Sequence, residues 1–111
     1  MPWPARWPLR RVLVRGPSMA PALRDGDQLL VVRTGRRRPP RAGDIVVVEL
    51  PDRPLAVKRV RRLDASGVWV EGDNPDGSTD SRTLGALATE AVVGRVVVRL
   101  WPRPGHVPPS H

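Results

Sequence analysis

Short segments rich in β-branched residues, each bounded by Gly, Pro or Asp, place the strongest constraint on how this chain can fold. Valine and isoleucine favour strands, whereas Gly, Pro and Asp favour the turns between them. Strands at this spacing are typical of a small domain that is mainly β. We therefore predict strands at residues 11–14, 28–33, 44–50, 55–63, 68–72 and 92–101.

One segment departs from this pattern. Residues 83–91, TLGALATEA, combine the helix formers Ala, Leu and Glu with a glycine, and predict one or two helical turns. A chain of 111 residues has the size of a single domain with a small core. We expect that domain at residues 11–102, after a flexible Pro/Arg/Trp-rich arm (1–10) and before a disordered Pro-rich tail (103–111).

Several kinds of site lack their components. The chain has no cysteine, which excludes disulfides, thiol nucleophiles and cysteine-bound metals. Its two histidines, His106 and His111, both lie in the expected tail, so a Ser-His-Asp triad and a histidine metal cluster are not predicted. We expect no metal and no cofactor.

The charge balance is strongly basic, with a formal net charge of +8. Such a charge allows attraction to an anionic membrane surface, to nucleic acid or to an acidic partner. The arginines are spread along the chain, however, which favours an ordinary solvated surface, and no nucleic acid is expected. No apolar run approaches the ~18 residues of a membrane span, so we expect a cytoplasmic or peripherally membrane-associated protein.

Among the 19 Lys+Arg residues, only Lys58 is a lysine. Arginine provides any surface cation, but it cannot lose a proton in a protein, whereas a buried lysine can. The single lysine is explained equally well by chance and by a task that needs deprotonation. Ala56, Lys58 and Val60 share one strand face, where burial would lower the pKa of an inward amine, although strand parity alone leaves its direction open.

Ser18 lies between Pro17 and Met19 in the stretch RGPSMAPALRDGD. A serine hydroxyl is a weak nucleophile until a base takes its proton. No histidine outside the tail is present for that task, and lysine is the remaining candidate base.

Ordered motifs across residues 14–101 resemble the type I signal peptidase family. A joint match of this many blocks is more specific than any single block. The resemblance implies a serine endopeptidase that removes a signal or propeptide from a protein precursor, on a mainly β fold of coiled antiparallel sheets. The matching blocks are GPSMAPAL (16–23), RDGD (24–27), AGDIVVV (42–48), VKRV (57–60), GDNPDGSTDSR (72–82) and VVGRV (92–96).

The resemblance also implies roles for individual residues. Ser18 matches the nucleophile and Lys58 the general base. Ser78 matches the serine that orients the lysine amine. Asp80 and Arg82 match an acid-base pair that supports the site, and the preceding Gly-Asp-Asn matches the turn that carries this block.

The nucleophile segment itself is expected to be stiff and well placed. Met19 and Pro21 match residues that shape it, and Pro17 restricts the backbone before the serine. An oxyanion at the attacked carbonyl needs donors, and Ser18 N–H is the expected one because Pro17 has none. Some members add a serine hydroxyl two positions earlier, where this chain has Gly16, so a second donor is unassigned.

The chain differs from typical members in ways that bear on its substrate. Typical members carry one or more N-terminal membrane helices and often a large inserted β domain, and we expect neither in this chain. A compact chain of this kind resembles the branch that matures nickel-type superoxide dismutase. The alternatives are general signal-peptide removal, a self-cleaving repressor-type domain and a basic nucleic-acid-binding β module. The oligomeric state is not predicted.

Overall fold

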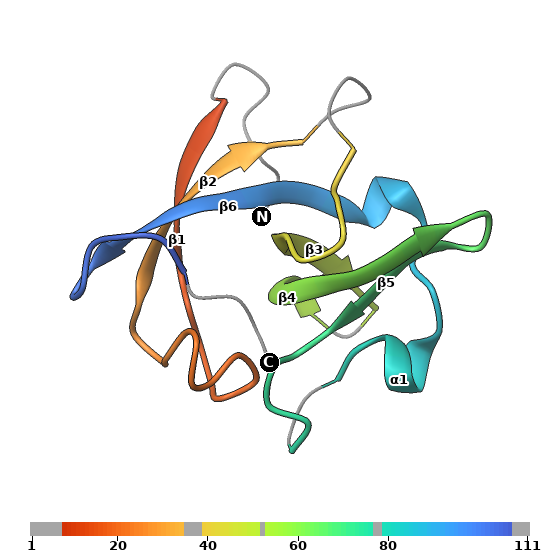
Figure 1. Cartoon of the computed structure of the whole chain (residues 1–111), viewed down its shortest axis with the longest axis horizontal. Coiled ribbons are helices and arrows are strands. Elements are labelled where there is room, and N and C mark those ends of the chain that lie inside the picture. The colour runs from red at the N-terminus through yellow and green to blue at the C-terminus, as the bar shows by residue number, and fades with distance from the viewer. Residues whose placement is uncertain (1–7, 35–38, 52, 77–78, 108–111) are drawn as a thin grey trace.

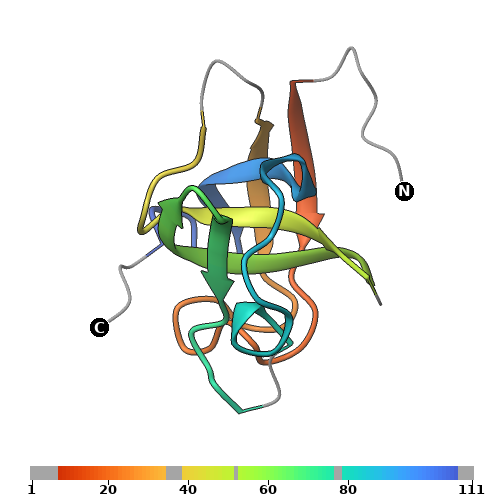
Figure 2. The same ribbon diagram turned by 90° about the vertical axis from the view of Figure 1, so that its right-hand side faces the viewer.

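The computed structural model describes residues 8–34, 39–51, 53–76 and 79–107, with only the backbone of residues 53 and 54 (Figure 1). The described chain forms one antiparallel six-stranded sheet in the order β1-β2-β6-β3-β4-β5, which confirms the mainly β prediction. In Figures 1 and 2, β1 and β2 run at a steep angle to β4, so the sheet is strongly coiled. The strands are β1 (Leu9–Leu13), β2 (Gln28–Arg33), β3 (Ile45–Leu50), β4 (Arg53–Asp64), β5 (Gly67–Glu71) and β6 (Val92–Trp101).

The predicted strands are all present, and two of them, β2 and β6, have the predicted bounds. β1 begins earlier than expected, since Leu9 pairs with Val32 and belongs to the sheet rather than to an arm. At the other end, Gly105 lies in the expected tail, yet its backbone exchanges two hydrogen bonds with Arg99 of β6, at 2.8 and 3.0 Å. Backbone pairing thus extends the ordered domain beyond both expected boundaries.

The predicted helical turns are found in two pieces, α1 (Ser81–Leu84) and the 3₁₀ turn η1 (Thr89–Ala91). Gly85, with a φ of 80°, ends α1 and separates the two. The first turn begins before the predicted segment because Asp80 caps it, accepting a hydrogen bond from Arg82 N. No helix in the described parts of the chain is long and apolar enough to span a membrane.

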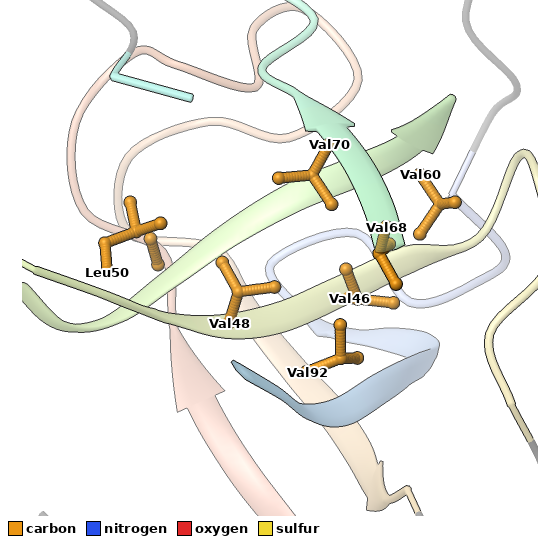
Figure 3. Close-up of a cluster of buried hydrophobic side chains, with 8 residues drawn as sticks. Val46, Val48, Leu50, Val60, Val68, Val70 and Val92 are labelled. Carbon is orange, nitrogen blue, oxygen red and sulfur yellow. The ribbon is translucent and has the colours of Figure 1, made fainter. Parts of the chain in front are cut away.

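Two apolar cores lie on opposite faces of the sheet. In β3, Val46 and Val48 face one core while Ile45 and Val47 face the other, so this central strand is buried on both sides. The valine core, shown in Figure 3, consists of Val46, Val48, Leu50, Ala56, Val60, Val68, Val70 and Val92. The methionine core consists of Val14, Met19, Leu23, Leu29, Val31, Ile45 and Val47.

Gly67, at the start of β5, allows the close backbone approach that holds the segment after α1 against the sheet. Its φ is +124°, and a Cβ there would overlap the carbonyl oxygen of Leu87. That oxygen accepts a hydrogen bond from Val68 N at 2.8 Å. We expect Gly67→Ala to lower the free energy of unfolding by about 2–4 kcal/mol in denaturant titrations, through backbone strain and overlap together.

Gly43→Ala is the matched control, because Gly43 also has a positive φ (+94°) but nothing lies within 4 Å of an added Cβ. It should lower stability by only about 1–2 kcal/mol, the contribution of left-handed backbone alone. If both variants lost the same free energy of unfolding, overlap with the Leu87 carbonyl would not contribute to the effect of Gly67→Ala.

Candidate active site

Ser18 lies in the segment that connects β1 to β2, in a turn whose neighbours are firmly held. Its side chain is partly exposed, whereas Met19, the next residue, is fully buried in the methionine core. Ala20 N donates to Pro17 O at 3.0 Å, and Leu23 N donates to Met19 O at 2.9 Å. The buried methionine and these turns fix the backbone and leave the serine hydroxyl accessible.

Gly16, two residues before the serine, has a conformation that favours glycine. Its φ is +80°, and its N–H donates to Asp25 Oδ1 at 2.7 Å. A serine at this position would be strained, so the backbone here disfavours the side-chain oxyanion donor that some signal peptidases carry. Pro17 and Pro21 on either side of the turn are exposed.

The far end of the same segment is attached to β6. Arg99 Nη1 donates to Ala22 O at 3.1 Å and lies 3.9 Å from Asp27 Oδ2. Asp27 in turn accepts from Arg24 N at 2.9 Å, so a buried carboxylate and a buried guanidinium hold the loop against the sheet. This anchor was not predicted from the sequence, because it joins residues far apart in the chain.

Lys58 lies in the middle of β4, directly opposite Val46 of β3. It is only 1% exposed, and its pairing with Val46 places its side chain on the face of the valine core, because directly paired residues point to the same face. Ala56 and Val60, two residues away on either side, belong to the valine core. The only lysine of the chain is therefore buried on an apolar face of the sheet.

A turn connects the surroundings of Lys58 with the serine segment. Arg59 pairs with Glu71, the last residue of β5, so Lys58 lies alongside the start of the turn formed by residues 72–76. Asn74 in this turn donates from its backbone N to Ser18 O at 2.9 Å and from Nδ2 to Pro17 O at 3.1 Å. The single asparagine of the chain thus holds the backbone on both sides of the Pro17–Ser18 bond.

The same turn is held from the other side by a buried ion pair. Arg59 Nε and Nη2 each donate to a carboxylate oxygen of Asp73 at 2.9 Å, and the two side chains are only 4% and 5% exposed. Arg59 Nη1 also donates to Gly43 O at 3.2 Å. This pair was not predicted from the sequence. A usable signal was present, since Arg59 directly follows the sole lysine in a strand that is apolar on both faces.

Asp80 and Arg82, predicted to act together, form an ion pair with a 2.6 Å contact. Asp80 is fully buried and also accepts from Gly72 N at 2.8 Å, while Arg82 Nη2 donates to Gly72 O at 3.2 Å. Hydrogen bonding to Asp80 is the main cause that raises the pKa of Arg82 above its usual value. The pair fixes the first residue of the 72–76 turn. Ser78 lies outside the described residues.

A groove of about 370 Å³ lies between β1 and β4, and Ser18 lines it. Apart from Ser18 and three arginines, its walls are apolar, and no carboxylate lines it. Among the described residues, no three His, Asp or Glu side chains lie close enough to hold a metal ion. The lining residues are Arg10, Arg11, Val12, Leu13, Val14, Arg15, Ser18, Met19, Val47, Leu55, Ala56 and Val57.

Comparisons with known proteins show which family the chain is similar to. Residues 8–97 match the family described as Peptidase S24-like. Mitochondrial inner membrane protease subunit 1 of Xenopus tropicalis is 33% identical over 114 residues, covering 82% of this chain and 68% of that protein. Mitochondrial ATP-independent inner membrane protease subunit 1b of Arabidopsis thaliana is 33% identical, covering 78% and 67%. Subunit 2 of the mitochondrial inner membrane protease of Saccharomyces cerevisiae is 29% identical, covering 80% and 66%.

Proposed function

Because this chain belongs to the Peptidase S24-like family, we propose that it is a serine endopeptidase that removes an N-terminal signal or propeptide from a protein precursor. The observation that carries the proposal is a groove lined by the partly exposed Ser18 and by Ala56, which lies two residues before the buried Lys58 on the same face of β4. The relatives are named as proteases, which supports hydrolysis of peptide bonds.

In the proposed mechanism, Ser18 Oγ attacks the carbonyl carbon of the scissile peptide while Lys58 Nζ, as a neutral amine, takes the hydroxyl proton. The C–N bond then breaks, and Lys58 returns the proton to the leaving amine. Water attacks the carbonyl carbon of the resulting Ser18 ester and loses a proton to Lys58. The ester C–O bond then breaks, Lys58 returns that proton to Ser18 Oγ, and the acid product leaves. Each step balances with the substrate and one water molecule.

The surroundings of Lys58 support its role as the base. Burial in an apolar environment disfavours the charged ammonium and therefore favours the neutral amine that can accept a proton. Ala56 and Val60 provide such an environment on either side. The neighbouring Arg59 cannot replace Lys58, because a guanidinium keeps its proton.

The developing oxyanion would be stabilised by the backbone N–H of Ser18. In the described residues this group donates no hydrogen bond, so it is available. Asn74 is the positioning residue in this proposal, since it binds the carbonyls of Pro17 and Ser18 and so directs the following backbone. Asp80 and Arg82 support the site through Gly72, and Ser78 is proposed to orient the lysine amine.

The substrate is proposed to bind as an extended peptide along β1. In the described sheet β1 pairs only with β2, which leaves its other edge open for pairing with a peptide backbone. Residues 10–13 of this strand and the two residues after it line the groove, and this stretch ends three residues before Ser18. Main-chain pairing there would deliver the scissile bond to the serine in a fixed register.

Incubation with two precursors tests this function, namely a nickel superoxide dismutase precursor and an exported preprotein. N-terminal sequencing of the products would identify the cut, and the chain incubated alone would report self-cleavage. Cleavage of one precursor is expected from the parent, and a loss of at least about 10³-fold from Ser18→Ala and from Lys58→Arg. Undiminished cleavage by Lys58→Arg would exclude a lysine base, because arginine keeps the charge but cannot deprotonate.

A further inference from the structure

The groove wall that β1 provides carries different side chains on its two faces. Along residues 9–15 exposure alternates without a break, with the odd-numbered residues exposed and the even-numbered ones partly or fully buried. Val14 belongs to the methionine core, so the even-numbered residues lie on the inner face of this wall. Side chains of an extended chain point alternately to opposite sides. Arg11, Leu13 and Arg15 therefore share the other face, and we name these three groove residues the outer row.

The outer row presents two guanidinium groups to the groove without a carboxylate to balance them. Within the described residues, neither Arg11 nor Arg15 forms an ion pair. Asp25 approaches the end of the row, but its carboxylate accepts a hydrogen bond from Gly16 N at 2.7 Å. Neither aspartate nor glutamate lines the groove, and the whole chain carries a formal charge of +8. The groove should therefore attract acidic side chains and repel basic ones.

We propose that the groove selects precursor peptides that carry aspartate or glutamate at two positions four residues apart. This proposal rests on the proposed function, in which an extended peptide pairs with the open edge of β1. Directly paired residues point to the same face, so peptide side chains opposite Arg11 and Arg15 meet the two guanidinium groups. These arginines are four residues apart, about 13 Å in an extended chain, and the paired peptide has the same spacing. A carboxylate accepts two hydrogen bonds from one guanidinium, which favours acidic side chains over amides.

The inner face of the wall sets a different requirement for the peptide side chains in between. Val12, Val14 and Met19 line the groove on this side, and Met19 is fully buried. Arg10, at the far end of the inner face, already interacts within the chain. A charged peptide side chain that points to the valines and the methionine would lose hydration without gaining a partner. The expected peptide therefore alternates, with acidic side chains toward the outer row and apolar ones toward the inner face.

Binding of fluorescent octapeptides to the Ser18→Ala variant tests this selectivity without any cleavage. Its failure is therefore distinguishable from failure of the peptidase proposal. The peptides consist of alanine and serine, and carry aspartate, asparagine or lysine at two positions four residues apart. A further peptide carries its two aspartates three residues apart, which keeps the net charge but places the carboxylates on opposite faces of the extended peptide. Fluorescence anisotropy measures each affinity.

Charge reversal in the outer row separates recognition by these residues from general attraction. In the Ser18→Ala background, Arg11→Glu combined with Arg15→Glu should make the lysine peptide bind more tightly than the aspartate peptide. Loss of structure alone cannot reverse a preference in this way. Arg24→Glu combined with Arg33→Glu is the matched control, because both arginines are exposed and lie outside the groove. This control changes the net charge by the same amount and should keep the original order of affinities.

With the outer row intact, the aspartate peptide should bind about fivefold to tenfold more tightly than the asparagine peptide, and the lysine peptide should bind most weakly. The peptide with aspartates three residues apart should lie between the first two. The proposal would be overturned by equal affinities for the aspartate and asparagine peptides, by no binding of any peptide, or by equal effects of the two double variants. Equal binding of the two aspartate peptides would overturn the four-residue spacing. Selective binding by a chain whose parent cleaves no precursor would contradict the peptidase function alone.

Discussion

Replacement of Lys58 by methionine is expected to abolish peptidase activity while leaving the fold at least as stable as the parent. The side chain is 1% exposed in the valine core, opposite Val46, so the protein bears the free-energy cost of desolvating an amine there. Methionine has a similar length, adapts to irregular packing and needs no desolvation of charge. The free energy of unfolding should therefore stay equal to that of the parent or rise.

Two measurements separate a catalytic from a structural lysine. Denaturant unfolding gives stability, and cleavage of a precursor gives activity, which should fall at least about 10³-fold because the general base is gone. Arg62→Met is the matched control. Arg62 is a long, exposed cation in the same strand, so its replacement should change stability and activity little. A drop of several kcal/mol in stability for Lys58→Met would show that the amine serves the fold.

The strands could be predicted from sequence because their positions follow from local chemistry. β2 and β6 have the predicted bounds, and a turn-favouring residue adjoins each of them, Asp27 before β2 and Pro102 after β6. The start of β1 could not be predicted in the same way, since Leu9 is strand only through its pairing with Val32. Likewise α1 begins at Ser81 because Asp80 caps it, a carboxylate whose predicted role was an ion pair.

In the candidate site, too, features set by local sequence could be predicted, whereas contacts between distant residues could not. Ser18 and Lys58 could be identified because one motif and one unusual residue type mark them. The contacts around them could not, because Asn74 reaches the serine backbone from 56 residues away in the chain. The apolar surface that β1, β2 and β6 share was not predicted, for a related reason. Its leucines look like ordinary strand residues, and only the register across the three strands shows that they share an exposed surface.

Removal of the Asp73 carboxylate is expected to affect both stability and activity. In Asp73→Ala, the Arg59 guanidinium stays buried after losing two hydrogen bonds of 2.9 Å to the carboxylate. Breaking one partner of a buried pair typically costs about 3–5 kcal/mol, a large share of the ~5–15 kcal/mol that stabilises a domain. The 72–76 turn would also lose its attachment to β4, so Asn74 would hold the Ser18 backbone less firmly and kcat should fall.

Asp76→Ala is the matched control, because Asp76 is an exposed carboxylate in the same turn and should change stability by no more than about 0.5 kcal/mol. The double variant Arg59→Met/Asp73→Ala also removes the guanidinium that Asp73→Ala leaves buried without its carboxylate. It should therefore regain much of the lost free energy of unfolding, yet keep the lowered kcat. The double variant thus separates two effects of the ion pair. Burial of its charges affects stability, whereas its attachment of the 72–76 turn to β4 affects the position of the Ser18 backbone. If the double variant recovered full activity together with stability, the turn would be held by other contacts, and the ion pair would have no positioning role.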